Sequence, residues 1–283
     1  YTGWYTLSLH DALPISQALH ADANVKLTAM ADMFADRLEQ SLAGLNKQPD
    51  VAAKIDVPPD RQFSGVDGYR QLIASGVDVV LLASPPHFRP AHLQAAVEAG
   101  VHVFAEKPVA VDGPGVRAVL ATCELAEKKK LAIVSGLCLR YSYGFQEVVR
   151  RIQDGQIGKV TTLYANDYRG SIWLKARQPE WTDMHNQMRN WYYYTWLSGD
   201  FNVEQHVHFL DVCAWAMGDR PGPPPWRPAA THRPGVRQHL RPSFRGVRIR
   251  RRGAADQQLP PDERLPQPDE RTGRGNAGHR LIS

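Results

Sequence analysis

Between Val25 and Leu137 the sequence alternates short apolar runs with helical patterns, and this alternation restricts the possible fold more than any other feature. The run GVDVVLLA, which ends at Ala83, is apolar and β-branched almost throughout, as expected for a strand buried on both faces. Strands and helices that alternate at this pitch predict a doubly wound parallel sheet. The expected strands cover residues 25–31, 76–83, 101–105 and 131–137.

The pattern changes after Leu137. A helical stretch with Phe145, Val149 and Ile152 leads into IGKVTTLYANDY, in which apolar and polar residues alternate as in a half-exposed strand. A Trp- and Tyr-rich segment follows over 171–199, and GDFNVEQHVHFLDVCAWAMGD then has the apolar spacing of a helix. We therefore expect one domain over 17–140 and the start of a second, α+β domain with a truncated, mostly antiparallel sheet over 141–221.

The charge of the chain is unevenly distributed. Residues 221–283 contain 13 Arg, no Lys and 5 acidic residues, so this tail carries +8 and the first 220 residues carry −3 of the overall +5. A nucleic-acid arm usually mixes lysines and aromatic residues among its arginines, and the tail lacks that pattern. We expect no nucleic-acid partner; a natural basic arm is the alternative.

No apolar run approaches the roughly 18 residues of a membrane span. The N-terminus also lacks the basic start and apolar block of a secretory signal. We therefore expect no membrane partner and, by default, a cytoplasmic location, with any original N-terminal signal lost. Three cysteines, Cys123, Cys138 and Cys213, have no metal-ligand spacing, so we expect buried free thiols and no metal site.

Ligands of an open parallel sheet bind beyond the carboxyl ends of its strands. The first expected strand ends in Asp32. A carboxylate there can accept hydrogen bonds from both ribose hydroxyls of an adenosine and repels a 2′-phosphate, which favours NAD over NADP. An aspartate that caps the next helix is the alternative.

The strand that ends at Ala83 runs into SPPHFRPAH, a turn stiffened by prolines. Ser84, Pro85 and the backbone amides of this turn are expected to face a cofactor. His92 is expected in the helix that follows, on the cofactor side. A plain surface loop is the alternative.

The next strand ends in AEKPVA, the most specific motif of the chain. Pro108 biases Lys107 toward an extended backbone, which determines where the lysine side chain points. A lysine partly buried in a cleft has a lowered pKa and can exchange protons near neutrality. We expect Lys107 to be catalytic, and Glu106 and Lys107 to contact the cofactor; an exposed loop lysine is the alternative.

These motifs resemble those of the Gfo/Idh/MocA oxidoreductases, which use nicotinamide cofactors on sugars and cyclic polyols. The resemblance covers about residues 17–220 and rests on Asp32, SPPHFRPAH, FAEKP and SGDFNVEQHVHFLDVCAWAMGD. It implies that residues 17–140 form an NAD-binding Rossmann-like domain. It also implies that Lys107 lies between nicotinamide and substrate, and that the parent protein is a homo-oligomer formed through the second-domain sheet.

The family also carries an acid and a histidine four residues apart, which map here to Glu204 and His208. Residues with this spacing share one face of an α-helix, so Glu204 is expected to orient His208 toward the cleft. The family acid is more often Asp, and Glu204 departs from that pattern. His206 is expected to be packed or hydrogen-bonded, and a buried structural histidine is the alternative for His208.

Aromatic and basic side chains of the second region are candidate substrate contacts, through stacking on a sugar face or hydrogen bonds to its hydroxyls. A place in the core is the alternative for each aromatic ring. The candidates are Arg169, Trp173, Trp191 and Tyr192.

Both ends of the chain depart from the family pattern. A back-translation of TLSLHDALPIS resembles a sequencing-library adapter, so residues 1–16 are expected to be a non-native leader that replaces the first strand and its glycine-rich turn. Residues 222–283 have no helical or strand period and the composition of a disordered segment. Read one base later, their codons can encode strings similar to the family's second domain. A natural N-terminus is the alternative for the leader.

These features together predict an NAD-dependent dehydrogenase, with this chain as a defective fragment of the parent enzyme. It would transfer a hydride between a hydroxyl-bearing carbon of a sugar or cyclic polyol and the nicotinamide, while His208 or Lys107 takes the hydroxyl proton. The alternatives are an NAD-dependent glycosidase of the same family and a non-catalytic sugar- or cofactor-binding protein.

Overall fold

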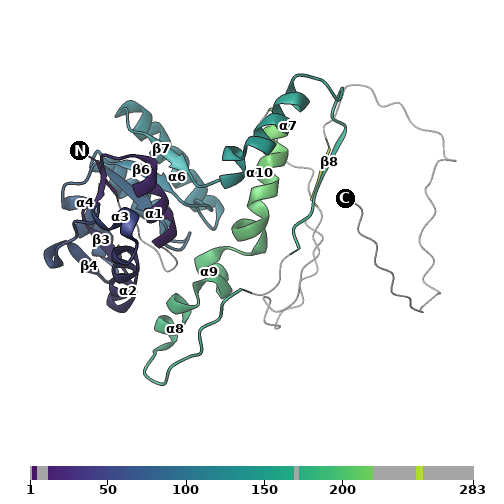
Figure 1. Ribbon diagram of the computed structural model, residues 1–283. Helices are drawn as coiled ribbons and strands as arrows, with labels where there is room; N and C mark the ends of the chain where they lie inside the picture. The colour runs from purple at the N-terminus through teal and green to yellow at the C-terminus, as the bar shows by residue number, and fades with distance from the viewer. Residues whose placement is uncertain (1, 5–11, 169–171, 219–246, 251–283) are drawn as a thin grey trace. The chain divides into compact units, whose positions relative to one another are not determined.

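The computed structural model describes residues 2–4, 12–168, 172–218 and 247–250 (Figure 1). The prediction for Arg169 lies outside these ranges, as do the predictions for residues 5–11 and for most of the tail. Within the described part, no helix is both long enough and apolar enough to cross a bilayer.

The first region is built on parallel strands, as predicted. β1 pairs with β2, β3 with β4, and β6 lies between β5 and β7, every pair being parallel. β1 also lies beside β5, which connects the strand groups. The strands are β1 (Thr2–Trp4), β2 (Val25–Leu27), β3 (Met30–Asp32), β4 (Gln62–Ser64), β5 (Val79–Leu82), β6 (His102–Ala105) and β7 (Ile133–Ser135).

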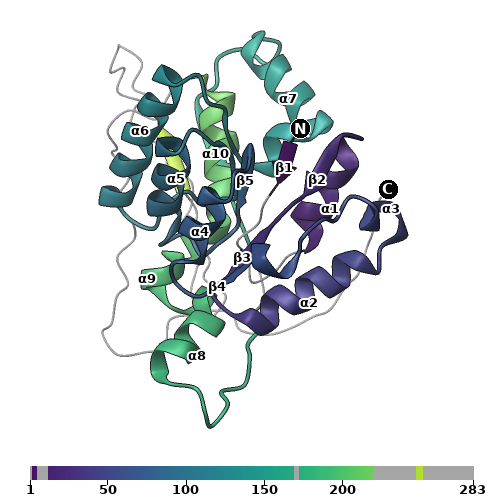
Figure 2. The same ribbon diagram turned by 90° about the vertical axis from the view of Figure 1, so that its left-hand side faces the viewer.

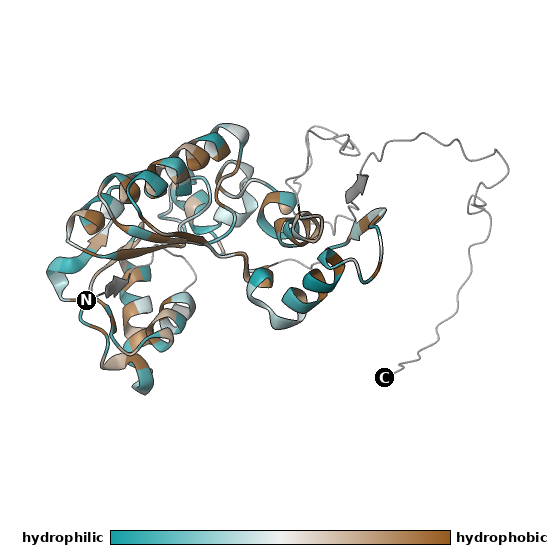
Figure 3. Cartoon of the chain, turned by 90° about the horizontal axis from the view of Figure 1, so that it is seen from above, coloured by the Kyte–Doolittle hydropathy of each residue, from teal (hydrophilic) through white to brown (hydrophobic). Residues whose placement is uncertain are grey.

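Helices cover both faces of these strands. α1 and α2 lie on one side, and α5 and α6 lie on the other (Figure 2). Coloured by hydropathy, the strands form an apolar layer between helices of mixed character (Figure 3). The helices of this region are α1 (Ala12–Ala21), α2 (Ala35–Asn46), α3 (Pro49–Ala52), η1 (Pro59–Arg61), α4 (Gly68–Ala74), α5 (Arg89–Glu98) and α6 (Gly113–Lys128).

The main core lies between the strands and α4, α5 and α6. Leu72, Val80, Leu82 and Leu93 are fully or almost fully buried there. Burying each such side chain stabilises the fold by about 1.5–3 kcal/mol. The expected burial of the cysteines holds for Cys213 alone, because the free thiols Cys123 and Cys138 are exposed.

The prediction that the first strand is missing is wrong for Thr2–Trp4, which form β1. A strand is held by main-chain hydrogen bonds, so an extended segment of almost any sequence can pair with β2. Helix α1 follows, and its Ile15 is fully buried against Leu19 and Leu27. The boundary expected after residue 16 therefore falls inside a helix. That residues 1–16 are a non-native leader encoded by a sequencing-library adapter stays a prediction.

The strand expected over 25–31 is divided into β2 and β3. At Leu27 the chain changes partners, since the Leu27 amide donates to the Lys54 carbonyl and the Asp56 amide donates to the Leu27 carbonyl. β3 then pairs with β4, and Asp32 is its last residue. The expected strand end at Asp32 is therefore confirmed.

The second region contains mainly helices. β8 (Thr162–Ala165) pairs antiparallel with β9 (Val247–Arg250). No strand was expected in the tail, yet VRIR alternates apolar and charged residues with the two-residue period of a strand. The helices are η2 (Cys138–Tyr141), α7 (Tyr143–Gln153), α8 (Asp183–Arg189), η3 (Trp191–Tyr193), α9 (Thr195–Ser198), η4 (Asn202–His206) and α10 (Val207–Ala216).

The helix expected over 199–219 begins with a π-helical turn, η4, before α10. A π-turn places residues at i and i+5 over one another, unlike the α-helical spacing of four. Gly199 precedes it with φ +84°, and a Cβ there would lie 2.6 Å from Cβ of Val203. Gly199 therefore allows the close approach that positions η4.

Gly199→Ala should lower the free energy of unfolding by about 3 kcal/mol or more, because it adds a clash with Val203 to the cost of roughly 1–2 kcal/mol for a left-handed alanine. Gly155→Ala is the matched control: its φ is +76°, and nothing in the described structure lies within 4 Å of the added Cβ. Urea denaturation of both variants tests this. Equal losses at the two positions would contradict the crowding at Gly199.

Candidate functional site

The predicted site residues lie at the ends of three parallel strands, of which β5 and β6 are neighbours. Asp32 ends β3, Ser84 follows β5, and Glu106 with Lys107 follows β6. Parallel strands end at the same edge of a sheet, so these side chains lie along one edge. The Lys107–Pro108 peptide bond within this edge is cis.

A pocket opens at the Asp32 end of this edge. It brings together four residues predicted from the sequence to contact a cofactor, Asp32, Ser84, Pro85 and His92. Aromatic and thioether side chains form most of its remaining wall, which suits an aromatic ligand ring. The other lining residues are Met33, Phe34, Gly65, Val66, Tyr69, Phe88 and Met188.

Asp32 is a buried carboxyl with 6% of its surface exposed. Its Oδ1 accepts a hydrogen bond of 2.8 Å from the Phe34 amide at the start of α2. Burial raises the pKa of Asp32 to about 6, and the Phe34 amide and the Arg37 charge oppose that shift. An acid with this pKa is mostly ionised at neutral pH and can accept ligand hydroxyls.

Ser84 and His92 form one buried pair, with Ser84 Oγ 3.1 Å from His92 Nδ1. Tyr69 stacks on the His92 ring at 4.0 Å between centroids. Burial, followed by the Arg89 charge, lowers the pKa of His92 to about 3. His92 is therefore a neutral side chain that shapes the pocket without carrying charge.

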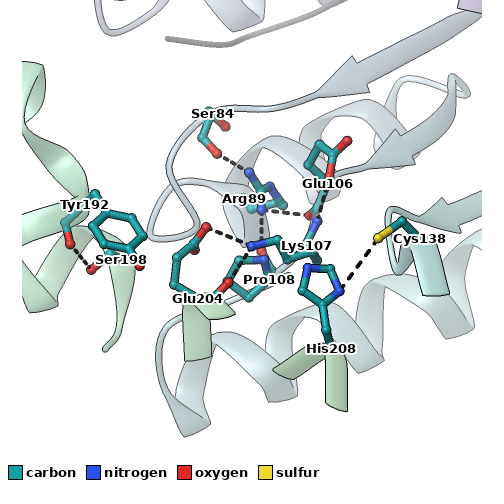
Figure 4. A network of polar contacts seen from close by, with 10 residues as sticks. All are labelled: Ser84, Arg89, Glu106, Lys107, Pro108, Cys138, Tyr192, Ser198, Glu204 and His208. Carbon is teal, nitrogen blue, oxygen red and sulfur yellow. Dashed lines mark hydrogen bonds and ion pairs between the residues drawn. The ribbon is translucent and has the colours of Figure 1, made fainter. Parts of the chain in front are cut away.

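Arg89 organises this edge of the sheet, and sequence analysis did not identify it. Its guanidinium is buried, with 2% exposed, and donates to the carbonyl oxygens of Ser84, Glu106 and Pro108 (Figure 4). These carbonyls belong to the segments that follow β5 and β6. Burial lowers the pKa of Arg89 to about 10, so the side chain stays charged at neutral pH. Arg89 thus connects the loop of Ser84 to the loop of Lys107.

Lys107 contacts Glu204 across 97 residues of sequence. Lys107 Nζ lies 3.1 Å from Glu204 Oε1 and also donates to the Glu204 carbonyl oxygen (Figure 4). Both side chains are mostly buried. The pair joins the end of β6 to η4, and the sequence motifs did not predict this contact.

The Glu204 carboxyl is almost fully buried beside the Lys107 ammonium. Burial raises its pKa, while the Lys107 charge and hydrogen bond lower it. Within the described residues, Glu204 Oε2 is buried and has no hydrogen-bond partner. A buried carboxyl oxygen without a partner suits a ligand hydroxyl.

Glu204 was expected to orient His208 from the same face of an α-helix. Glu204 lies in the π-turn η4, which ends before His208, and its Oε1 accepts from Lys107. The orienting role of Glu204 stays a prediction. His208 Nδ1 lies 4.0 Å from Sγ of Cys138, which belongs to η2 (Figure 4). His206 is fully buried with Nε2 3.2 Å from the Ala165 carbonyl oxygen, as expected for a packed, hydrogen-bonded histidine.

The predicted substrate aromatics gather on one another. Trp191 packs with the cluster of Phe34, Met188 and Leu197, and its ring lies 6.2 Å from that of Trp173. The Tyr192 ring contacts Trp191 edge-on, and the Tyr192 carbonyl accepts from Ser198 Oγ.

Glu106 lies in the Lys107 loop, where a Cβ on Gly136 would come within 2.5 Å of its Oε2.

Residues 16–136 match the family model described as oxidoreductase family, NAD-binding Rossmann fold (GFO_IDH_MocA). Over 134 residues the chain is 31% identical to an inositol 2-dehydrogenase/D-chiro-inositol 3-dehydrogenase of Halalkalibacterium halodurans, which covers 47% of this chain and 34% of that protein. It is 27% identical to an inositol 2-dehydrogenase of Burkholderia cenocepacia over 65% of this chain and 50% of that protein. The chain thus spans one third to one half of these relatives.

Solved structures show the same fold. An aldose-aldose oxidoreductase from Caulobacter crescentus has a TM-score of 0.58 and 19% identity, over 78% of this chain and 58% of that chain. A putative myo-inositol dehydrogenase from Sinorhizobium meliloti has a TM-score of 0.53 and 19% identity, over 78% of this chain and 56% of that chain. The predicted Rossmann-type fold is therefore confirmed.

Arg89→Met should lower the free energy of unfolding by roughly 3–5 kcal/mol, because it leaves three carbonyl oxygens without their buried charged donor. Arg70→Met on α4 is the control, since the Arg70–Asp67 pair is exposed and contributes at most about 1 kcal/mol. Thermal and chemical denaturation measure both. A loss below about 1 kcal/mol for Arg89→Met would contradict the role of Arg89 at the sheet edge.

Proposed function

We propose that the parent protein of this chain, whose residues 16–136 match the Gfo/Idh/MocA oxidoreductase family model, catalyses a nicotinamide-dependent dehydrogenation of a sugar or cyclic polyol. The observation that carries this proposal is the buried Lys107–Glu204 pair on the sheet edge that also holds the Asp32 pocket. Residues 17–140 would hold the cofactor, and residues 141–221 would begin the substrate-binding domain.

The residues of the pocket fit the adenosine half of a dinucleotide. Asp32 offers a buried carboxylate for the ribose hydroxyls, and Phe34, Phe88 and Met188 offer apolar walls for the adenine. NAD is the proposed form because an acid at this position repels the 2′-phosphate of NADP. When bound, the nicotinamide ring would accept the hydride from the hydroxyl-bearing carbon of the substrate.

The side chains around Lys107 would bind the substrate hydroxyl and take its proton. Glu204 Oε2 would accept a hydrogen bond from a substrate hydroxyl, while Oε1 stays bound to Lys107 Nζ. As that hydroxyl becomes a carbonyl, its proton would pass to the His208 ring. The Lys107 ammonium, which already donates to Glu204, would stabilise the negative charge that develops on the substrate oxygen.

The relatives support the proposed substrate class by their names. They include inositol 2-dehydrogenases and, at 25% identity over 152 residues, a D-glucoside 3-dehydrogenase of Escherichia coli. All of these names specify a secondary hydroxyl on a ring. We also propose that the sheet that begins with β8 joins subunits of the parent protein, since Tyr164 on β8 is largely exposed.

Lys107→Ala should lower kcat for NAD reduction by about 100-fold or more, because it removes the cation that stabilises the developing charge and the partner of Glu204. His208→Ala should lower kcat as well, and Lys128→Ala on the exposed end of α6 should leave it unchanged. NADH formation with myo-inositol and alkyl glucosides measures this. Activity unchanged in Lys107→Ala would contradict the proposed role of Lys107, and activity absent from the unaltered chain would favour a non-catalytic binding protein.

The affinity for NAD should fall about tenfold as the pH decreases from about 8 to about 5, because only ionised Asp32 accepts both ribose hydroxyls and its pKa is about 6. The sign for stability is opposite. A carboxyl with a raised pKa favours the folded state when it is protonated, and that contribution is lost as the pH rises through about 6. Calorimetric titration of Asp32→Asn should show weaker binding with little dependence on pH. An equal pH dependence in that variant would contradict the assignment to Asp32.

A further inference from the structure

We infer that the segment Trp181–Arg189 of the second region forms an outer wall of the cofactor pocket, with Met188 as a cofactor contact and Arg189 as the residue that positions it. This inference rests on the proposed binding of a nicotinamide dinucleotide in the Asp32 pocket. It adds a contribution from outside the matched residues 16–136 to cofactor binding.

Met188 lines the pocket, although it lies outside the expected cofactor domain of residues 17–140. It lines the pocket together with Phe34 and Phe88, and it is buried. It belongs to the same apolar cluster as Phe34 and Leu197. A thioether beside aromatic rings is a favourable partner for a further flat ring such as adenine.

Arg189 fastens this wall to α2. Its Nη1 and Nη2 donate to the two carboxylate oxygens of Asp36 at 2.8 and 2.7 Å. Its guanidinium carbon also lies 3.8 Å from the centroid of the Phe34 ring. Arg189 is buried while Asp36 is half-exposed, and the bidentate contact lowers the pKa of Asp36. Two-point contact of this kind defines orientation as well as distance.

The Phe34 ring is held by a second contact from the same segment. His185 stacks on Phe34 with centroids 4.8 Å apart, and Trp181 stacks on His185 at 5.0 Å. Arg189 Nε donates to His185 Nε2 at 3.0 Å, so this ring carries its proton on Nδ1 when neutral. Phe34 follows Asp32 by two residues and lines the pocket, so these contacts reach the ribose site itself.

Helix α8 is too short to be stable alone, since isolated helices below about 12–15 residues are marginal in water. Its ends are held locally: Thr182 Oγ1 accepts from the His185 amide, and Asn190 exchanges two hydrogen bonds with the backbone of Lys175. The contacts to Asp36 and Phe34 then place it against the pocket. Loss of the Arg189–Asp36 contact would therefore free this wall and speed the release of a bound dinucleotide.

The wall also restricts the shape of the base. A cofactor whose adenine carries an added etheno ring needs more room beside Met188. Met188→Ala should provide that room. It should weaken the binding of NAD and raise the affinity for etheno-NAD relative to that for NAD. A purely structural role for Met188 would lower the affinity for both cofactors in the same proportion.

The test is the dissociation rate of NADH from the full chain, measured by stopped-flow fluorescence. Arg189→Ala and Asp36→Ala should each increase this rate by roughly tenfold, and the double variant should match the single variants because one contact is lost in each case. Arg151→Ala, which removes an exposed ion pair with Glu147 on α7, is the control and should leave the rate unchanged.

Four outcomes decide the matter. Faster release in Arg189→Ala and Asp36→Ala, with a gain for etheno-NAD in Met188→Ala, supports the inference. Unchanged release in both single variants overturns it while NADH binding by the unaltered chain keeps the proposed function. Equal acceleration in Arg151→Ala overturns it as well, because the effect would not be specific to this contact. No binding of NADH by the unaltered chain overturns the proposed function and the inference together.

Discussion

Lys107 and Glu204 are 97 residues apart in sequence, yet Nζ and Oε1 lie 3.1 Å apart at the carboxyl edge of the sheet. The rest of the site depends on this contact. Arg89 holds the Lys107 loop through the carbonyl oxygens of Glu106 and Pro108, and Gly199 lets η4 approach closely enough to present Glu204. Without Lys107 the buried Glu204 carboxylate would have no charge to compensate for its lost solvation. The same contact joins the first region to the second at the proposed reaction site.

Burial sets the electrostatic character of this edge. It raises the pKa of Asp32 and Glu204 and lowers that of His92, so two acids are poised for hydrogen bonding or proton transfer while the imidazole stays neutral. Groups with shifted pKa values are common at active sites, although ion-pair networks of purely structural value also shift pKa values. The unpartnered Oε2 of Glu204, within the described residues, is the observation that favours a ligand here.

Much of the cofactor side could be predicted from the sequence, because strand ends in a parallel sheet converge by topology. Asp32, Ser84, Pro85 and His92 lie in one pocket for this reason. Arg89 escaped prediction because its partners are backbone carbonyls, which leave no trace in side-chain patterns. The pairing of Glu204 with Lys107 escaped it because apolar spacing does not distinguish a π-turn from an α-helix. β1 was missed because strand pairing depends on the main chain.

A structure of the chain with NAD bound tests the account most directly. We predict that the adenosine ribose hydroxyls lie within hydrogen-bond distance of Asp32, that the adenine contacts Phe34 and Met188, and that the nicotinamide lies beside Lys107. A dinucleotide bound away from Asp32, or a nicotinamide distant from the Lys107–Glu204 pair, would contradict the account.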